Sequence, residues 1–325
     1  MLYIVSESKD RTGVILGRQT GSGYLIMKSK HTKDRYISDI LKMVISLLVG
    51  YAIFFLVINF SSAAYQICKE PWIHGRLLAM VMQLSSLIFC LYLYTQYVLK
   101  SSFSDLYIRR GKRENIWYLI ALIVPAGICS FYLIFVPGSL KIGDYRLDEM
   151  IAMLISGILL SGVTTAITEE LIFRGLMLKS VETLLGKRIA ILISSLLFAV
   201  YHLVNIDVSD SRKVMLVLTG TMLAGLALGL VTIHMESIWP SVMIHAMYNI
   251  LGGDSALINI SNDQLFPALF SYTLKTDRWM LAGIPGTDDM ETALPAMVGF
   301  AIIIFLAQYR ILKEKEEHER NNIDY

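Results

Sequence analysis

The chain has 325 residues, of which 55% are hydrophobic and 17% are charged, and its mean hydropathy is +0.56. Soluble domains are about 45–50% apolar and about 25% charged, so this composition excludes an ordinary soluble protein. The formal net charge is only +2, which gives no support to a nucleic-acid partner. The composition therefore predicts an all-α, polytopic membrane helix bundle whose surroundings are the lipid bilayer.

Apolar runs of about 20 residues, the length that crosses a hydrocarbon core as helix, recur along the chain. A polar, basic arm at 1–39 precedes them and does not resemble a cleavable signal peptide. The fourth span is expected to continue as helix past Arg174 toward Lys179, and the seventh is short and carries polar residues. The sequence predicts eight spans, at about residues 42–63, 78–98, 116–136, 150–172, 188–206, 214–234, 238–252 and 292–309.

Positive charges are concentrated in alternate loops, a bias that sets the orientation of a polytopic protein. The arm and the loops after the second and fourth spans are rich in Lys and Arg, so we expect them in the cytoplasm. Eight spans then place both termini in the cytoplasm. The predicted organisation is a cytoplasmic arm (1–39), three spans (40–148), a motif-bearing catalytic core (149–252), an extracytoplasmic loop (253–291), and a last span with a cytoplasmic tail (292–325).

The fourth span ends in ITEELIFRG, which places two carboxylates and an arginine beside an apolar run. Ionisable groups inside a membrane are rare, pair with one another and mark functional sites. Glu170 and Arg174 are four residues apart and share a helix face, so we expect an ion pair that anchors the helix. Glu169 is turned by about 100° from Glu170, because a helix turns once in about 3.6 residues. Glu169 can therefore face a cavity while its neighbour is held.

Two more spans offer polar groups to the same pocket. His202 follows Phe198 by four residues in the fifth span, and His245 and Asn249 share a face of the seventh. A desolvated carboxylate suits general-base work, and a neighbouring imidazole can orient water or share the proton. An amide and a second imidazole are donors of the kind that stabilise an oxyanion. These groups, together with Glu169, are sufficient to hydrolyse an amide without a nucleophilic serine or cysteine.

The same side chains also permit metal chemistry. Two histidines and a glutamate form a known catalytic zinc set, so Glu169, His202 and His245 are candidate ligands. The HExxH spacing is absent, and the ligands would come from three separate helices. We therefore expect no cofactor and keep a zinc site as the alternative.

Three short motifs occur in order on consecutive late spans: EELIFRG, FAVYH and HAMYN. They resemble the E-E-x-x-x-R, F-x-x-x-H and H-x-x-x-N motifs of the CPBP family. Its members are CAAX-type prenyl endopeptidases and Abi-type bacterial relatives linked to bacteriocin processing or immunity. The resemblance covers about residues 150–252 and departs from none of the three motifs. It implies an intramembrane endopeptidase acting on a membrane-associated peptide or protein.

The resemblance also implies roles for the motif residues. Glu169 corresponds to the base that activates water, and His202 to the histidine that assists it. His245 and Asn249 correspond to the residues placed at the oxyanion. The family's prenyl substrate is not carried over, since the charge bias and compact size suit a bacterial plasma membrane. The remaining motif residues would be structural supports of the site: Glu170, Arg174 and Phe198.

Two non-proteolytic interpretations stay open. A membrane protein of this kind can confer bacteriocin immunity, or regulate a sensor kinase, by binding alone. Intramembrane charges also mark ion paths in transporters, although the sequence has no internal repeat of the kind that many transporters show. The sequence does not indicate an oligomeric state.

Straight, upright helices would keep two of the site residues apart. At about 1.5 Å per residue, Glu169 lies about 30 Å along a span that begins at Glu149, which places it at the cytoplasmic edge. His202 lies about 21 Å into the next span, measured from that same edge. We therefore expect a long fourth helix and a funnel that opens to the cytoplasm. In the sixth span, Gly225 and Gly229 are four residues apart, which predicts close helix packing beside the site.

Overall fold

The structure is a computed structural model. It describes residues 22–67, 72–204, 206–251, 255–262, 267–276, 278–283 and 293–323, with the backbone alone at 22–35, 72–73 and 322–323. Its contacts divide the chain into two units, and the boundary falls inside the first helix, after Lys42. The packing described below is that of the larger unit.

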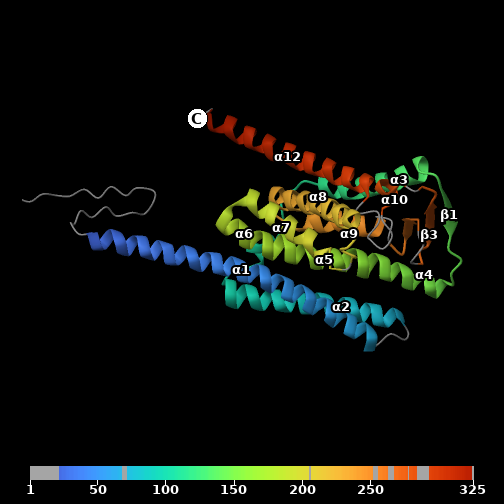
Figure 1. Ribbon diagram of the computed structural model, residues 1–325, viewed down its shortest axis with the longest axis horizontal. Coiled ribbons are helices and arrows are strands. Elements are labelled where there is room, and N and C mark those ends of the chain that lie inside the picture. Colours follow the sequence, from blue (N-terminus) through green and yellow to red (C-terminus); the bar gives the residue numbers. More distant parts are fainter. Residues whose placement is uncertain are drawn as a thin grey trace, which may run out of the picture. The chain divides into compact units, whose positions relative to one another are not determined.

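The described residues form helices joined by short connections (Figure 1). The α-helices are α1 (Ser22–Ile67), α2 (Trp72–Leu93), α3 (Ile116–Phe135), α4 (Leu147–Leu154), α5 (Thr165–Glu169), α6 (Leu178–Leu185), α7 (Lys187–Tyr201), α8 (Ser211–Met235), α9 (Trp239–Leu251), α10 (Trp279–Ala282) and α12 (Leu294–Ile323). Wider π-helical turns form η1 (Tyr94–Leu99), η3 (Ile155–Thr164) and η4 (Glu170–Met177), and a 3-10 turn forms η2 (Phe103–Leu106). The strands are β1 (Gly138–Ile142), β2 (Ile258–Ser261) and β3 (Phe270–Leu274).

The prediction of a helical membrane bundle is confirmed, and the number of long spans is corrected. Among the described residues, six helices are long and apolar enough to cross a membrane. They are Tyr36–Ile67, His74–Leu99, Ile116–Phe135, Leu147–Leu185, Ser211–Met235 and Leu294–Asn321. The fifth and seventh predicted spans are α7 and α9, which have only 15 and 13 residues. Both are shorter than the roughly 20 residues that a span requires, and both carry motif residues.

Helix α1 begins at Ser22, so the second part of the predicted arm 1–39 is helical, while residues 1–21 lie outside the described part. A small sheet, which the sequence analysis did not predict, uses part of the segment 253–291. Its order is β1-β3-β2, with β1 antiparallel and β2 parallel to β3. The Tyr272 hydroxyl donates to the carbonyl of Val136 at 2.8 Å and ties the sheet to the end of α3.

The fourth span is one long helix, as predicted. Residues Leu147–Leu185 run without a break through α4, η3, α5, η4 and α6, from the strands to the turn before α7 (Figure 1). Gly186 has a φ of +80° and ends the helix. At about 1.5 Å per residue, Glu169 lies about 24 Å from this turn along one helix, and His202 about 22 Å along the next. The long helix therefore brings both residues to the same depth.

The motif-bearing segment η4 is the centre of the packing. All eight of its residues are buried, and Phe173 has no exposed surface. The Phe173 ring lies 5.9 Å from the rings of Tyr51 and Phe54 on α1, and 5.2 Å from the ring of Phe198 on α7. Helix α7 also supplies the Ser194 hydroxyl, which donates to the Phe173 carbonyl at 2.7 Å. A helix buried on every side is held in position by its neighbours, so its polar groups have fixed places.

Helices α7 and α8 approach closely at Gly225, as the small-residue spacing predicted. A Cβ at Gly225 would lie 2.7 Å from Ser195 Cβ and 2.8 Å from Ser195 Cα. One turn further on, a Cβ at Gly229 would lie 3.2 Å from the Ile191 side chain. The absence of a side chain at Gly225 therefore allows the contact that positions α7.

We expect Gly225→Val to lower the free energy of unfolding by about 1–3 kcal/mol, because an overpacked contact forces the backbones apart. Thermal unfolding in detergent measures the change. Gly127→Val is the matched control, since a Cβ at Gly127 meets nothing within 4 Å. Equal stability of the two variants would show that the α7–α8 contact is easily rearranged.

Candidate active site

Polar motif residues from three helices meet around the Phe198 ring. The ring centroid lies 4.5 Å from that of His202 and 6.0 Å from that of His245. The guanidinium carbon of Arg174 lies 4.2 Å from the same centroid, which is a cation–π distance. Phe198, which the motif suggested as a support, thus contacts side chains from all three motifs.

The predicted ion pair is present. Arg174 Nη1 donates to Glu170 Oε1 at 2.9 Å, and neither side chain has exposed surface. Spacing of four residues brings the two groups to one face even though Glu170 lies in a π-helical turn. Removing both charges from water is unfavourable, and close pairing offsets much of that penalty.

His245 contacts both glutamates. Its Nδ1 lies 2.8 Å from Glu170 Oε1, the oxygen that also accepts from Arg174, and its Nε2 lies 3.6 Å from Glu169 Oε2. The sequence analysis did not predict the bond between His245 and Glu170. The two residues are 75 positions apart, and no periodicity or local pattern signals such a contact.

The imidazole of His245 lies between the two carboxylates. Its Nδ1 donates to Glu170, so its Nε2 faces Glu169. Buried charges need compensation, and Arg174 is the cation paired with Glu170. The geometry thus links Glu169 to the Glu170–Arg174 pair through one imidazole ring.

His202 and Asn249 complete the predicted set. His202 Nδ1 lies 2.8 Å from the carbonyl of Phe198 and donates to it, which leaves Nε2 as an acceptor. Asn249 Nδ2 donates to the Ser161 carbonyl at 3.2 Å, and a primary amide has a second N–H. Asn249 lies one turn beyond His245 on α9, and its bond to Ser161 connects α9 to η3.

Residues 151–251 match the family model described as type II CAAX prenyl endopeptidase Rce1-like. In this segment the chain is similar to the CAAX endopeptidase family. The match covers just under a third of the chain, contains all three motifs and confirms the resemblance seen in the sequence. No curated protein and no solved structure matches the chain.

Within residues 151–251, the donor types suit zinc. His245 Nδ1 bonds Glu170 and His202 Nδ1 bonds a backbone carbonyl, which is the usual support of a metal-binding imidazole and leaves both Nε2 atoms available. Of the residues described, only one group of three His, Cys, Asp or Glu donors lies within 4.8 Å of one another, and it is elsewhere: Glu114, His234 and Glu314. A zinc ion on Glu169, His202 and His245 would need these side chains to move.

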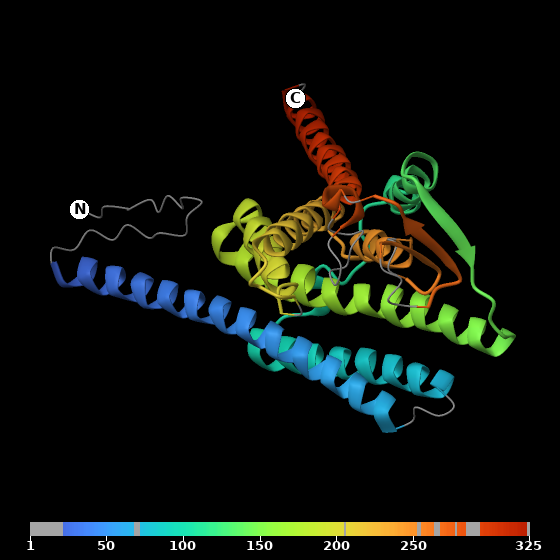
Figure 2. The same ribbon diagram turned by 45° about the vertical axis from the view of Figure 1, so that its right-hand side comes forward.

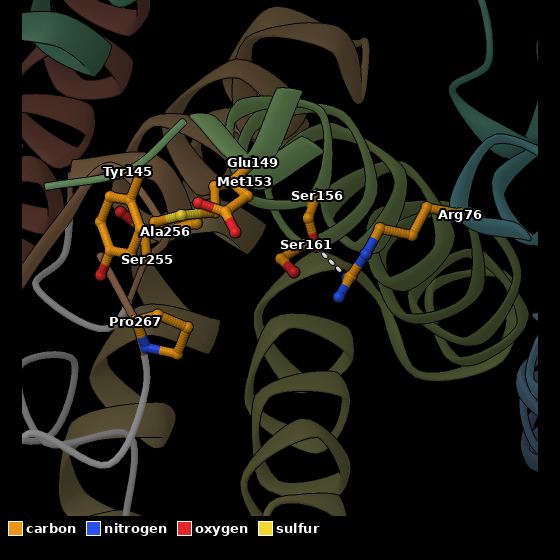
Figure 3. Close-up of a pocket in the computed structure, with 10 residues that line it drawn as sticks. Arg76, Tyr145, Glu149, Met153, Ser156, Ser161, Ser255, Ala256 and Pro267 are labelled. Carbon is orange, nitrogen blue, oxygen red and sulfur yellow. Dashed lines mark hydrogen bonds between the residues drawn. The ribbon is translucent and has the colours of Figure 1, made fainter. Parts of the chain in front are cut away.

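A cavity of about 460 Å³ lies at the end of the bundle that carries the strands, and residues of the matched segment form part of its wall (Figure 3). Figure 3 shows Ser156 and Ser161 between Arg76 on one side and Glu149 on the other, and Arg76 donates to the Ser156 hydroxyl. The volume of the cavity is in the range of small-molecule sites, about 300–1,000 Å³. The carbonyl of Ser161 accepts from Asn249, so the cavity wall and the motif residues share a hydrogen bond. The complete lining is Arg76, Tyr145, Glu149, Met153, Ser156, Gly157, Ser161, Ser255, Ala256 and Pro267.

Proposed function

We propose that the protein is an intramembrane glutamic endopeptidase of a bacterial plasma membrane, with both termini in the cytoplasm. It hydrolyses a peptide bond in a membrane-associated peptide or protein. The observation that carries the proposal is the contact of one imidazole, His245, with two buried carboxylates in the segment similar to CAAX endopeptidases. The Arg174 guanidinium donates to one of these carboxylates, Glu170, and the proposal assigns the chemistry to Glu169.

In the proposed reaction, Glu169 takes a proton from water, and the water oxygen attacks the carbonyl carbon of the peptide bond. The tetrahedral oxyanion accepts a hydrogen bond from the Asn249 amide. Collapse breaks the C–N bond, and Glu169 returns the proton to the leaving amine. His202 Nε2 accepts a hydrogen bond from the attacking water and orients it. The products are a carboxylic acid and an amine, so one water molecule is consumed.

The geometry favours a different task for His245 from the oxyanion role that the motif implied. Both of its nitrogens face carboxylates, at 2.8 and 3.6 Å. In the proposal His245 positions the carboxylate of Glu169, while oxyanion stabilisation falls to Asn249.

Cleavage of a peptide library by the purified protein, with and without a chelator, tests the proposal against two alternatives. Chelator-resistant cleavage that is lost in Glu169→Gln supports the glutamic mechanism. Cleavage that is lost both in Glu169→Gln and on addition of the chelator supports zinc chemistry with Glu169, His202 and His245 as ligands. If no peptide is cleaved under any condition, a binding-only role in bacteriocin immunity or regulation takes its place.

The cavity beside Asn249 is the proposed place for the substrate segment next to the scissile bond. We expect Ser161→Trp, which fills this cavity, to lower kcat/KM at least about tenfold, because the substrate is no longer positioned. Leu159→Trp is the matched control, since Leu159 is two residues away, is 38% exposed and does not line the cavity. Equal kcat/KM values for the two variants would place the substrate elsewhere.

A further inference from the structure

Three segments far apart in the sequence meet at the end of α8. Glu114 precedes α3, His234 is in the last turn of α8, and Glu314 lies on α12. One donor atom from each lies within 4.8 Å of the other two. Loop charge predicts this end of the bundle to be cytoplasmic.

Backbone hydrogen bonds fix two of these three residues. The amide of Lys112 donates to the Met235 carbonyl at 3.1 Å, and the amide of Ile238 donates to the Tyr107 carbonyl at 3.1 Å. At Gly111, a Cβ would lie only 2.4 Å from the Met235 carbonyl oxygen, so the loop lies directly on the helix end. The loop that carries Glu114 and the helix turn that carries His234 therefore form one rigid support.

His234 is buried between the two carboxylates. Its side chain has no exposed surface, and the Trp117 ring packs edge-on against it at 5.7 Å. Its Nε2 lies 3.2 Å from Glu114 Oε2, within hydrogen-bond distance. Its Nδ1 lies 3.7 Å from Glu314 Oε2 and has no hydrogen-bond partner among the described residues. A buried polar nitrogen without such a partner is unfavourable unless another group binds there.

We propose that Glu114, His234 and Glu314 bind a divalent transition-metal ion such as Zn²⁺. One imidazole and two carboxylates are a ligand set that zinc accepts, at bond lengths of about 2.0–2.2 Å. Ligands in tetrahedral contact with one ion lie closer together than 4.8 Å, so the glutamate side chains move inward by rotamer changes. Glu114 and Glu314 are 22% and 41% exposed, which leaves them room to move and gives the ion a path from solvent.

Lys112 competes with the ion for one ligand. Its Nζ lies 2.6 Å from Glu314 Oε2 and supplies the local positive charge when no ion is bound. A divalent ion brings two positive charges to two carboxylates and replaces the ammonium. If these residues bound no ion, they would form an ion-pair cluster. The metal site and the ion-pair cluster differ in the effect of removing Lys112. A metal site gains affinity when Lys112 is removed, whereas an ion-pair cluster only loses a partner.

The ion would pin α12 to the rest of the bundle. Figure 2 shows the C-terminal turns of α12 projecting beyond the bundle, and the contacts of Glu314 tie the helix to α8 and the loop before α3. Metal binding that joins separate elements adds its free energy to the stability of the folded state. The metal is therefore expected to order the tail after Arg310, independently of the proposed peptidase chemistry.

Calorimetric titration of the chelator-stripped, full-length protein with Zn²⁺ tests the site. We expect one saturable site per chain, with affinity lowered at least about 100-fold in Glu314→Gln and His234→Gln, because even outer-shell changes cost about 10–100-fold. Glu316→Gln on the same helix is the matched control, and Lys112→Met is expected to bind Zn²⁺ at least as tightly as the parent. Zn²⁺ should also slow trypsin cleavage in the tail at Lys313 and Lys315.

Three results would overturn the proposal. They are the absence of saturable Zn²⁺ binding, unchanged binding in Glu314→Gln, and loss of binding in Glu169→Gln, which would place the ion at the active site. Because Glu314 is a partly exposed helix residue, its substitution preserves the fold even if His234→Gln does not fold. Failure of the proposed peptidase function would leave these measurements unaffected, since none of them uses cleavage.

Discussion

Glu169→Gln is expected to lower the rate of peptide cleavage by about 10²–10⁴-fold, the range that a positioned general base contributes. Glutamine has the size and shape of glutamate but cannot accept the proton of water. Its side chain still fits beside His245 Nε2, now as a neutral partner, so the structure of the site is preserved. Initial rates on a peptide identified in the library measure the loss.

The matched control is Glu236→Gln, which removes a surface carboxylate paired with Arg109. It should cleave at the parent rate, and both variants should unfold within a few degrees of the parent. Undiminished cleavage by well-folded Glu169→Gln protein would exclude Glu169 as the base. The base would then have to be another group near His245.

Local spacing was sufficient to predict part of the site. Residues four apart on a helix must share a face, so the pair Glu170–Arg174 follows directly from the sequence. The long fourth helix followed from the requirement that Glu169 and His202 reach one depth. The close packing at Gly225 followed in the same way from small residues at helical spacing.

Contacts between distant segments could not be predicted in this way. The bond from His245 to Glu170 joins residues 75 positions apart, and the carboxylates around His234 come from different elements. The strands β1 and β3 pair across more than a hundred residues, and the sequence gives no register for such a pair. The short helices α7 and α9 were counted as full spans because apolar composition does not reveal where a helix stops.

Arg174→Met is expected to lower the free energy of unfolding by about 3–5 kcal/mol, because it leaves the carboxylate of Glu170 buried without its cation. Both side chains have no exposed surface, so solvent cannot replace the guanidinium. Methionine keeps much of the apolar contact with Phe198, which separates the loss of charge from the loss of packing. Denaturant or thermal unfolding in mild detergent measures the change.

The double variant Glu170→Gln/Arg174→Met removes both charges and should recover most of that stability. Arg212→Met is the matched control for losing an arginine: Arg212 is 67% exposed in its pair with Asp210, and pairs at the surface contribute about 0–1 kcal/mol. If Arg174→Met and the double variant were equally unstable, Glu170 would not be held as an anion by Arg174. Recovery in the double variant would instead show that the pair is not needed for stability as such. Its role would then be to hold a charged Glu170 against His245 Nδ1, which directs the other imidazole nitrogen toward Glu169.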